Sequence, residues 1–347
     1  MAKLRVGVIG TGSIGNVHLD GYTRQSKLVT IAAICDVTKS RLDEMGEKYG
    51  IPAQHRYRDY KQMLANEELD AISICVPNYL HFPIATDVIK AGIDLLLEKP
   101  MVLTMQEARK LRQTHQENPV KLMIAFSHRF FMANIQAKKL IDKGAIGKPF
   151  MIRVRYAHSG PYPGWAQSNW FYKKNQAGGG AMLDMGIHGI DICQYFIGPI
   201  DNVQAQVRTL RKKIQVDDNA VVVADFGKEA ACLGYIEVGW TSPSGFNGVE
   251  IYGDKGNITL ELGKEGIINR GTVKPDGTII TNEETIPAAN GSAHWPFQVE
   301  CFVKYCLGKK TVTTIPGLHE GQSSLAVALA AFESSKTGKR VKVKRLN

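Results

Sequence analysis

The stretch LRVGVIGTGSIG (residues 4–15) decides the fold, because it joins an apolar strand through a glycine turn to a helix that begins near Ile14. Gly10 permits the tight turn, Gly12 lets the backbone approach a pyrophosphate, and Gly15 lets the helix pack closely on the strand. The free N–H groups at the helix start suit phosphate. Glycines in an unliganded turn are the alternative, but the strand-to-helix context favours a dinucleotide site. Its expected contacts are Gly10, Gly12, Ser13, Ile14 and Gly15.

An acidic residue, Asp36, ends the next apolar stretch, VTIAAICD (residues 29–36). A carboxylate at this position accepts hydrogen bonds from the adenosine ribose hydroxyls and repels a 2′-phosphate. Cations follow at Lys39 and Arg41, although they are not immediately adjacent to Asp36 in the sequence. We therefore predict that the protein binds NAD rather than NADP.

The first part of the chain alternates apolar strands with amphipathic helices. Thr38 is placed to cap one helix, and Thr104 with Glu107 forms a capping-box pattern for another. Continuous apolar strands separated by helices predict a parallel sheet that is buried on both faces. We therefore expect an α/β protein whose residues 1–125 form a doubly wound Rossmann domain, with strands at 4–10, 29–36, 71–77, 93–100 and 121–126.

After Phe126 the pattern changes to long strands with alternating apolar and polar residues, which is typical of an antiparallel sheet with one exposed face. A helix is expected at 133–143 and another at 318–335, followed by a half-exposed strand in RVKVKRL (340–346). We predict an α/β domain at 126–347 with an open, mainly antiparallel sheet, whose last helix and strand pack back on the first domain. The expected strands are 149–158, 202–210, 219–226, 230–240, 248–254 and 257–262.

Composition excludes several functional classes. The 347 residues are 44% hydrophobic, and no stretch approaches the roughly 20 apolar residues that cross a bilayer. The net charge of +10 is concentrated in the C-terminal tail, without a recognisable nucleic-acid module. The chain begins directly with a strand, so a cytoplasmic location is expected. The six cysteines show no CxxC spacing, which predicts buried thiols and no metal site.

Two further segments carry candidate catalytic residues. Lys99, in EKP (98–100), follows a parallel strand at the edge where such sheets bind ligands, although an ordinary solvated lysine is the alternative. In GGGAMLDMGIHGID (178–191), a helix starting near Gly180 would place Asp184 and His188 on one face, so that the carboxylate orients the imidazole. A satisfied core histidine is the alternative for His188. Close approach of a ligand or another backbone would explain the flanking Gly186 and Gly189.

In this order, GTGSIG (10–15), VPNYLH (76–81), EKP and GGGAMLDMGIHGID resemble the Gfo/Idh/MocA oxidoreductases, over nearly the whole chain. The resemblance implies a catalytic group of Lys99, Asp184 and His188, in which His188 transfers the proton and Asp184 is its partner. It also implies further cofactor contacts at Pro77, Asn78, His81, Glu98 and Lys99. Substrate contacts are expected among Arg129, His158, Trp165, Trp170 and Lys173, although loop or interface packing is the alternative for the tryptophans.

The resemblance implies an NAD(H)-dependent dehydrogenase that acts on a hydroxyl or keto group of a sugar, a cyclitol or a sugar derivative, and that forms a homodimer or homotetramer. One alternative is a member that acts on a phosphorylated or nucleotide-linked sugar and recycles a tightly bound NAD. Cations at Arg153, Arg155, Lys173 and Lys174 favour that alternative, but they fit solvated positions equally well. Another alternative is a non-catalytic, NAD-sensing regulatory protein. Neither a nucleic acid nor a membrane is expected as a partner.

Overall fold

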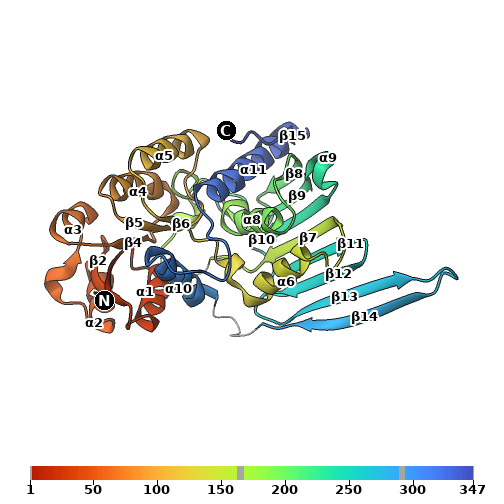
Figure 1. Ribbon diagram of the computed structural model, residues 1–347. Coiled ribbons are helices and arrows are strands. Elements are labelled where there is room, and N and C mark those ends of the chain that lie inside the picture. Colours follow the sequence, from red (N-terminus) through yellow and green to blue (C-terminus); the bar gives the residue numbers. More distant parts are fainter. Residues whose placement is uncertain (1, 162–167, 289–293, 347) are drawn as a thin grey trace.

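The computed structural model describes residues 2–161, 168–288 and 294–346, and it contains two β-sheets that lie side by side (Figure 1). One continuous group of buried side chains extends from the first sheet into the second, so the two parts share a core. Among the described residues, no helix has the length and apolar character needed to cross a membrane. These residues also contain no cluster of three or more His, Cys, Asp or Glu side chains arranged to hold a metal ion.

The first sheet has six strands, all parallel, in the order β3-β2-β1-β4-β5-β6. This is the predicted doubly wound Rossmann arrangement. Strand β3 was not predicted, because its two residues are too few to form a hydrophobic pattern. The strands are β1 (Leu4–Ile9), β2 (Val29–Cys35), β3 (Arg56–Tyr57), β4 (Ala71–Ile74), β5 (Asp94–Leu97) and β6 (Leu122–Ile124).

Helices cover both faces of this sheet. Apolar side chains of α1 and α2 pack on one face together with the later helix α10, whereas α3, α4 and α5 pack on the other. The capping box of Thr104 and Glu107 is present, but Thr38 caps α2 without a side-chain hydrogen bond. The helices are α1 (Ser13–Arg24), α2 (Lys39–Lys48), α3 (Tyr60–Asn66), α4 (His81–Lys90) and α5 (Met105–Glu117), with short 3₁₀ turns η1 (Ala53–His55), η2 (Asn78–Leu80) and η3 (Ser127–Phe130).

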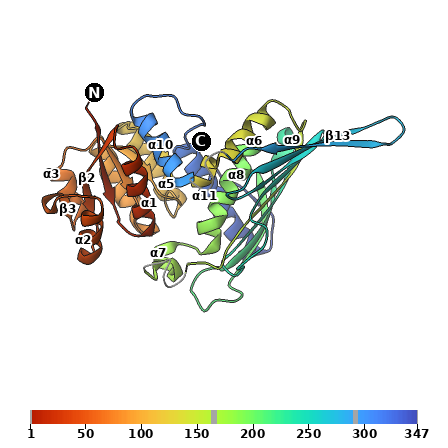
Figure 2. The same cartoon turned by 90° about the horizontal axis from the view of Figure 1, so that it is seen from below.

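The second sheet has nine strands in the order β14-β13-β12-β11-β7-β10-β9-β8-β15, and all neighbours except β7 and β10 are antiparallel. It is therefore the mainly antiparallel sheet that was predicted. The hairpin β13–β14 was not predicted, and it projects beyond the rest of the sheet (Figure 2). The strands are β7 (Pro149–Ala157), β8 (Asn202–Arg208), β9 (Asn219–Asp225), β10 (Leu233–Gly239), β11 (Gly248–Gly253), β12 (Gly256–Glu261), β13 (Gly266–Val273), β14 (Ile279–Ile286) and β15 (Val341–Lys342).

Two helices, α8 and α11, cover one face of the second sheet, and α11 also contacts α5 and β6 of the first part. Helix α10, which was not predicted, packs against α1. The helical elements here are α6 (Met132–Asp142), η4 (Trp170–Tyr172), α7 (Lys174–Ala177), η5 (Met182–Gly186), α8 (Ile187–Phe196), α9 (Gly227–Ala230), α10 (His294–Cys306) and α11 (Leu318–Thr337).

Candidate functional site

The glycine turn between β1 and α1 has the geometry that its sequence predicts. Gly10 has a φ of +89°, and a Cβ there would lie 2.3 Å from the Cys75 carbonyl oxygen. A Cβ at Gly15 would lie 1.9 Å from the carbonyl oxygen of Gly10, so helix and strand need the glycine. At Gly12, by contrast, a Cβ would meet only the end of the Arg41 side chain, at 3.8 Å. The open side of the turn therefore leaves room for a phosphate against the first N–H groups of α1.

Asp36 lies beside this turn and is held by three hydrogen bonds. Its Oδ2 accepts from the N–H of Thr11 at 2.9 Å and from the Thr11 hydroxyl at 3.1 Å, and its Oδ1 accepts from the N–H of Thr38 at 2.8 Å. Arg41 is not adjacent to Asp36 in the sequence, but the first turn of α2 brings its Nη1 to 3.6 Å from Oδ2. Arg58 also lines the cavity beside Asp36.

These neighbours lead to a prediction about cofactor choice. Replacing Asp36 with serine keeps a hydrogen-bond acceptor for the turn but removes the charge that repels a 2′-phosphate and pairs with Arg41. We expect Asp36→Ser to shift the ratio of kcat/KM for NAD over NADP toward NADP by about 100-fold, the size of one or two charged hydrogen bonds. The measurement is steady-state kinetics with both cofactors. Asp43→Ser, on the exposed side of α2, is the matched control, and an unchanged ratio in Asp36→Ser would contradict the assignment.

A cavity of about 900 Å³ runs along the carboxyl ends of the parallel strands, where open α/β sheets bind ligands. It contains most of the residues predicted to bind the dinucleotide, together with the substrate candidates Trp170 and Lys173. Trp170 stacks on Phe171, with ring centroids 3.9 Å apart. The predicted cofactor residues that line the cavity are Gly10, Gly12, Ser13, Ile14, Asp36 and Pro77.

Three other residues predicted to contact the cofactor have protein partners instead. Asn78 Nδ2 donates to the carbonyl oxygen of Ala177 at 2.9 Å, which ties η2 of the first part to the end of α7 in the second. The buried His81 ring lies between two backbone carbonyl oxygens, those of Pro100 at 2.7 Å and Val76 at 2.9 Å. Glu98 is also buried. Its Oε1 lies 3.1 Å from His18 Nε2, and its Oε2 accepts from the N–H of Lys99. These side chains fix the walls of the cleft.

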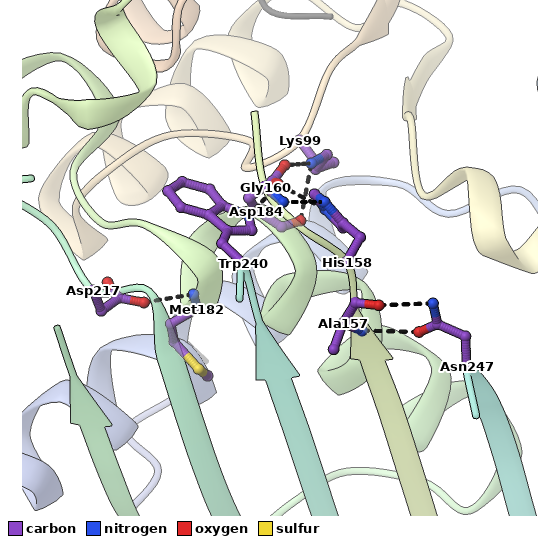
Figure 3. Close-up of polar contacts among 9 residues, drawn as sticks. All are labelled: Lys99, Ala157, His158, Gly160, Met182, Asp184, Asp217, Trp240 and Asn247. Carbon is purple, nitrogen blue, oxygen red and sulfur yellow. Dashed lines mark hydrogen bonds and ion pairs between the residues drawn. The ribbon is translucent and has the colours of Figure 1, made fainter. Parts of the chain in front are cut away.

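Lys99 and Asp184 form an ion pair that joins the end of β5 to η5 (Figure 3). Lys99 Nζ donates to Asp184 Oδ1 at 2.7 Å and to the Asp184 carbonyl oxygen at 2.9 Å. An ammonium has three protons, so one remains for a ligand. The solvated-lysine alternative is excluded, because only 16% of the Lys99 side chain is exposed.

The other oxygen of Asp184 faces two aromatic side chains. Trp240 Nε1 donates to Oδ2 at 3.0 Å, and His158 Nε2 lies 3.9 Å from the same atom. His158 Nδ1 accepts from the N–H of Gly160, so the neutral ring carries its proton on Nε2, toward Asp184. Burial alone would raise the pKa of Asp184, but the charges of Lys99 and His158 and the hydrogen bonds from Lys99 and Trp240 lower it. Asp184 therefore stays ionised and keeps Lys99 in place.

The predicted pairing of Asp184 with His188 was wrong. The helix does not run regularly through both residues, since η5 is a π-helix over Met182–Gly186 and α8 begins only at Ile187. Within the described residues, no side-chain hydrogen bond or ion pair joins Asp184 to His188. The glycine at position 189 is also explained differently from the prediction. A Cβ there would lie 3.0 Å from Ile236 and 3.3 Å from Val154. Close packing of α8 on the second sheet, rather than a ligand, requires the small residue.

His188 is buried near the ion pair, in surroundings that disfavour its charged form. Burial lowers its pKa well below the ordinary histidine value, and the nearby His128, Lys99 and His294 lower it further. Its ring stacks on that of His128, with centroids 4.2 Å apart and planes inclined by 12°. His188 is therefore a neutral imidazole at neutral pH, as a group that accepts a proton must be.

Other cationic candidates form ion pairs of their own. Arg129 forms a buried, bidentate pair with Asp191, at 2.7 and 2.6 Å, and lines a separate cavity beside α6 and α11, so its assignment as a substrate contact is corrected. Arg153 and Arg155 lie on the open face of the second sheet, where they pair with Glu250 and Glu237. These two arginines do not support a phosphorylated substrate. Trp165 lies outside the described residues.

Sequence reasoning missed three residues that build the site. Asp217 accepts from the N–H groups of Gly180 and Met182, both at 2.7 Å, and so fixes the start of η5. Asn247 holds Ala157 at the end of β7 through both its N–H and carbonyl groups, each at 2.8 Å (Figure 3). The third is Trp240, which donates to Asp184. It is the last residue of the strand predicted at 230–240, and a place at a strand end was its sequence signal for a role in the site.

Comparison with known proteins agrees with this geometry. The family model for the "oxidoreductase family, NAD-binding Rossmann fold" matches residues 4–126, and the model for the GFO/IDH/MocA C-terminal domain matches residues 134–259. The chain belongs to the GFO/IDH/MocA oxidoreductase family. As a member of this family it is an oxidoreductase, and its cofactor is NAD.

Individual relatives of this GFO/IDH/MocA protein are similar over most of its length. The D-glucoside 3-dehydrogenase of Escherichia coli is 26% identical, with 99% of this chain and 98% of the relative covered. The myo-inositol 2-dehydrogenase of Thermotoga maritima is 29% identical, with 76% of each chain covered. A solved structure of levoglucosan dehydrogenase in complex with NADH and levoglucosan has the same fold, with a TM-score of 0.86, 22% identity, and 99% of this chain and 100% of the other covered.

Proposed function

We propose that this protein is a dehydrogenase that transfers a hydride between NAD and a hydroxyl or keto carbon of a sugar, a cyclitol or a derivative of these. The observation that carries the proposal is the Lys99–Asp184 pair, which joins the end of β5 to η5, directly before the helix α8 that holds His188. The relatives named for D-glucoside, myo-inositol and levoglucosan support a polyhydroxylated substrate.

Each catalytic candidate has a distinct role in this proposal. The third proton of the Lys99 ammonium donates a hydrogen bond to the reacting hydroxyl, while Asp184 holds the ammonium in position. His188 accepts the hydroxyl proton at Nε2, because its Nδ1 is enclosed and has no hydrogen-bond partner among the described residues. NAD, when bound along the glycine turn, supplies the hydride acceptor. In the reverse direction, His188 returns the proton.

The division of labour between the two parts belongs to the same proposal. We assign residues 1–125 to cofactor binding and residues 126–347 to substrate binding and oligomerisation. His158, which faces Asp184, is the best-placed substrate contact in the second part. Trp170 and Lys173 contact the cofactor side of the cleft, since both line the dinucleotide cavity. A cytoplasmic location is supported by the free, buried state of all six cysteines.

A substrate screen tests the proposed reaction. The purified protein is incubated with polyols, cyclitols, sugars, sugar phosphates and nucleotide sugars, and NADH absorbance is followed with NAD and NADP in parallel. NADH formation with an uncharged sugar or cyclitol supports the proposal. Cofactor that survives purification and exchanges hydride without net NADH release would point to the recycling alternative. Tight NAD binding without turnover of any compound would favour the regulatory alternative.

We also propose that the protein forms a homodimer or homotetramer through the open face of the second sheet. That face exposes apolar side chains on adjacent strands, among them Val223 on β9 and Tyr235 on β10, which are opposite each other in the ladder. Val223 is 51% exposed and Leu233, also on β10, is 49% exposed. A contiguous apolar patch of this kind is typical of a protein interface.

A charge placed on this face should separate the subunits. We expect Tyr235→Lys to convert the oligomer to monomer, because an unpaired ammonium would be buried in the interface. The measurement is molar mass by light scattering during size-exclusion chromatography. Val312→Lys, at an exposed apolar position outside this sheet, is the control. An unchanged mass in Tyr235→Lys would place the interface elsewhere.

A further inference from the structure

His188 is enclosed by aromatic rings. It lies in the first turn of α8, and His128 lies in η3, directly after the parallel sheet. The two imidazoles are nearly parallel, at 12°, with centroids 4.2 Å apart, and both side chains are buried. Phe126 also contacts His188 in an edge-to-face arrangement, with ring planes at 74° and centroids 6.2 Å apart. Both residues belong to the second part of the chain, but they come from two separate elements, η3 and α8, that meet in a single stacked pair.

The usual means of orienting a catalytic histidine is missing from the described residues. Such a ring is normally fixed by a hydrogen bond from its second nitrogen to a carboxylate or a carbonyl. His188 Nδ1 is buried without a hydrogen-bond partner, and the carboxylate of Asp184 is bound to Lys99 and Trp240. The plane of the His188 ring is therefore set by ring packing.

His128 is itself held firmly enough to serve as a platform. Its backbone carbonyl oxygen accepts from Asn134 Nδ2 at 2.8 Å, which fixes the η3 turn. The ring packs edge-to-face against Tyr156, at 87° and 4.5 Å, and against Phe131, at 60° and 5.7 Å. Phe131 in turn stacks on His294, with centroids 3.9 Å apart. The His128 ring is thus held in place by residues from β7, from the start of α6 and, through Phe131, from α10.

We propose that His128 is a positioning residue for the reaction, which holds the imidazole plane of His188 by stacking. The inference rests on the proposed role of His188. A relay of protons between the rings is not part of it, because N–H bonds lie in the plane of each ring and no hydrogen bond joins the two. Among the described residues, the charged or titratable groups near the pair include Lys99, His158 and His294, and the Tyr156 ring packs against His128.

Two variants separate stacking from simple filling of space. His128→Phe keeps a flat ring against His188, whereas His128→Leu has a similar volume but no ring face. We expect kcat to fall about 10-fold or more in His128→Leu, with KM changed less than 3-fold, because a misoriented base slows only the chemical step. His128→Phe should restore kcat to within about 3-fold of the unsubstituted enzyme. Equal rates in the two variants, whether both fast or both slow, would overturn the proposal.

A measurement without substrate keeps the inference apart from the proposed function. In ¹⁵N-labelled protein, the ring signals of His188 are identified by their loss in His188→Gln. Because the His128 ring lies against that of His188, with centroids 4.2 Å apart, we expect the His188 ring signals to shift in His128→Leu, which has no ring face, and to shift less in His128→Phe. Ring signals that do not move in His128→Leu would contradict the stacked arrangement. If His188→Gln retains full activity, the proposed function fails; if it is inactive while His128→Leu is fully active, this inference alone fails.

Discussion

Replacing Lys99 with methionine is expected to lower kcat/KM about 1,000-fold while NAD binding changes no more than a few-fold. Methionine keeps an unbranched apolar stem but removes the ammonium that meets the reacting hydroxyl, and loss of one preorganised donor costs about 100- to 1,000-fold. Cofactor binding should persist, because the glycine turn and Asp36 line the dinucleotide cavity separately. NADH absorbance gives the rate, and calorimetric titration gives the NAD affinity. Lys110→Met, at an exposed position on α5, is the control.

The same variant leaves the Asp184 carboxylate without its cation. Removal of one partner from a buried pair destabilises a protein by about 3–5 kcal/mol, so the melting temperature must be measured alongside the rate. Lys99→Arg retains the charge but moves the donors, and we expect it to fold normally yet remain at least about 100-fold slower. Rates close to those of the unsubstituted enzyme in both variants would remove Lys99 from the catalytic group.

The second large effect is expected at His188. His188→Gln should lower kcat about 100- to 10,000-fold, the usual contribution of general acid–base catalysis, with KM and NAD affinity little changed. The control is His319→Gln, at an exposed position in the first turn of α11. Turnover like that of the unsubstituted enzyme would exclude His188 as the base.

The pH dependence provides an independent check on His188. Burial and the nearby His128 and Lys99 lower its pKa well below the ordinary value. A base acts when deprotonated, so kcat/KM should stay level as pH falls from 8 through the ordinary histidine value of about 6.5 and decline only at more acid pH. A decline centred above that value would show that another group controls the rate.

Local patterns in the sequence predicted the Rossmann part well, for a physical reason. Gly10 is needed because its φ is +89°, and Gly15 is needed because a Cβ there would lie 1.9 Å from the carbonyl oxygen of Gly10. A requirement of this kind involves residues that are close together in the sequence, so a local motif predicts it. Strand β3 and the hairpin β13–β14 lacked such signals, since β3 has only two residues and β14 is exposed along nearly its whole length. Without a buried face, a strand has no alternation to detect.

The candidate site was harder, because its contacts join residues far apart in the chain. Ordered motifs predicted Lys99, Asp184 and His188 as candidate catalytic residues. The prediction assumed a regular helix between the last two, and the π-helix changes their relative directions. Asp217, which fixes that turn through two backbone N–H groups, has no local mark of its function. The pairing of Arg129 with Asp191 depends equally on tertiary contacts.

The Lys99–Asp184 ion pair has a consequence for how this protein can be divided or recombined. Its two members come from opposite sides of the proposed domain boundary, so neither half contains a complete reaction centre. A chimera that takes its first half from one relative and its second from another inherits cofactor choice from the first. The activity of the chimera depends on whether the aspartate of the second half lies close enough to the lysine of the first half to form the ion pair. The position of the second half relative to the first therefore decides whether this ion pair can form.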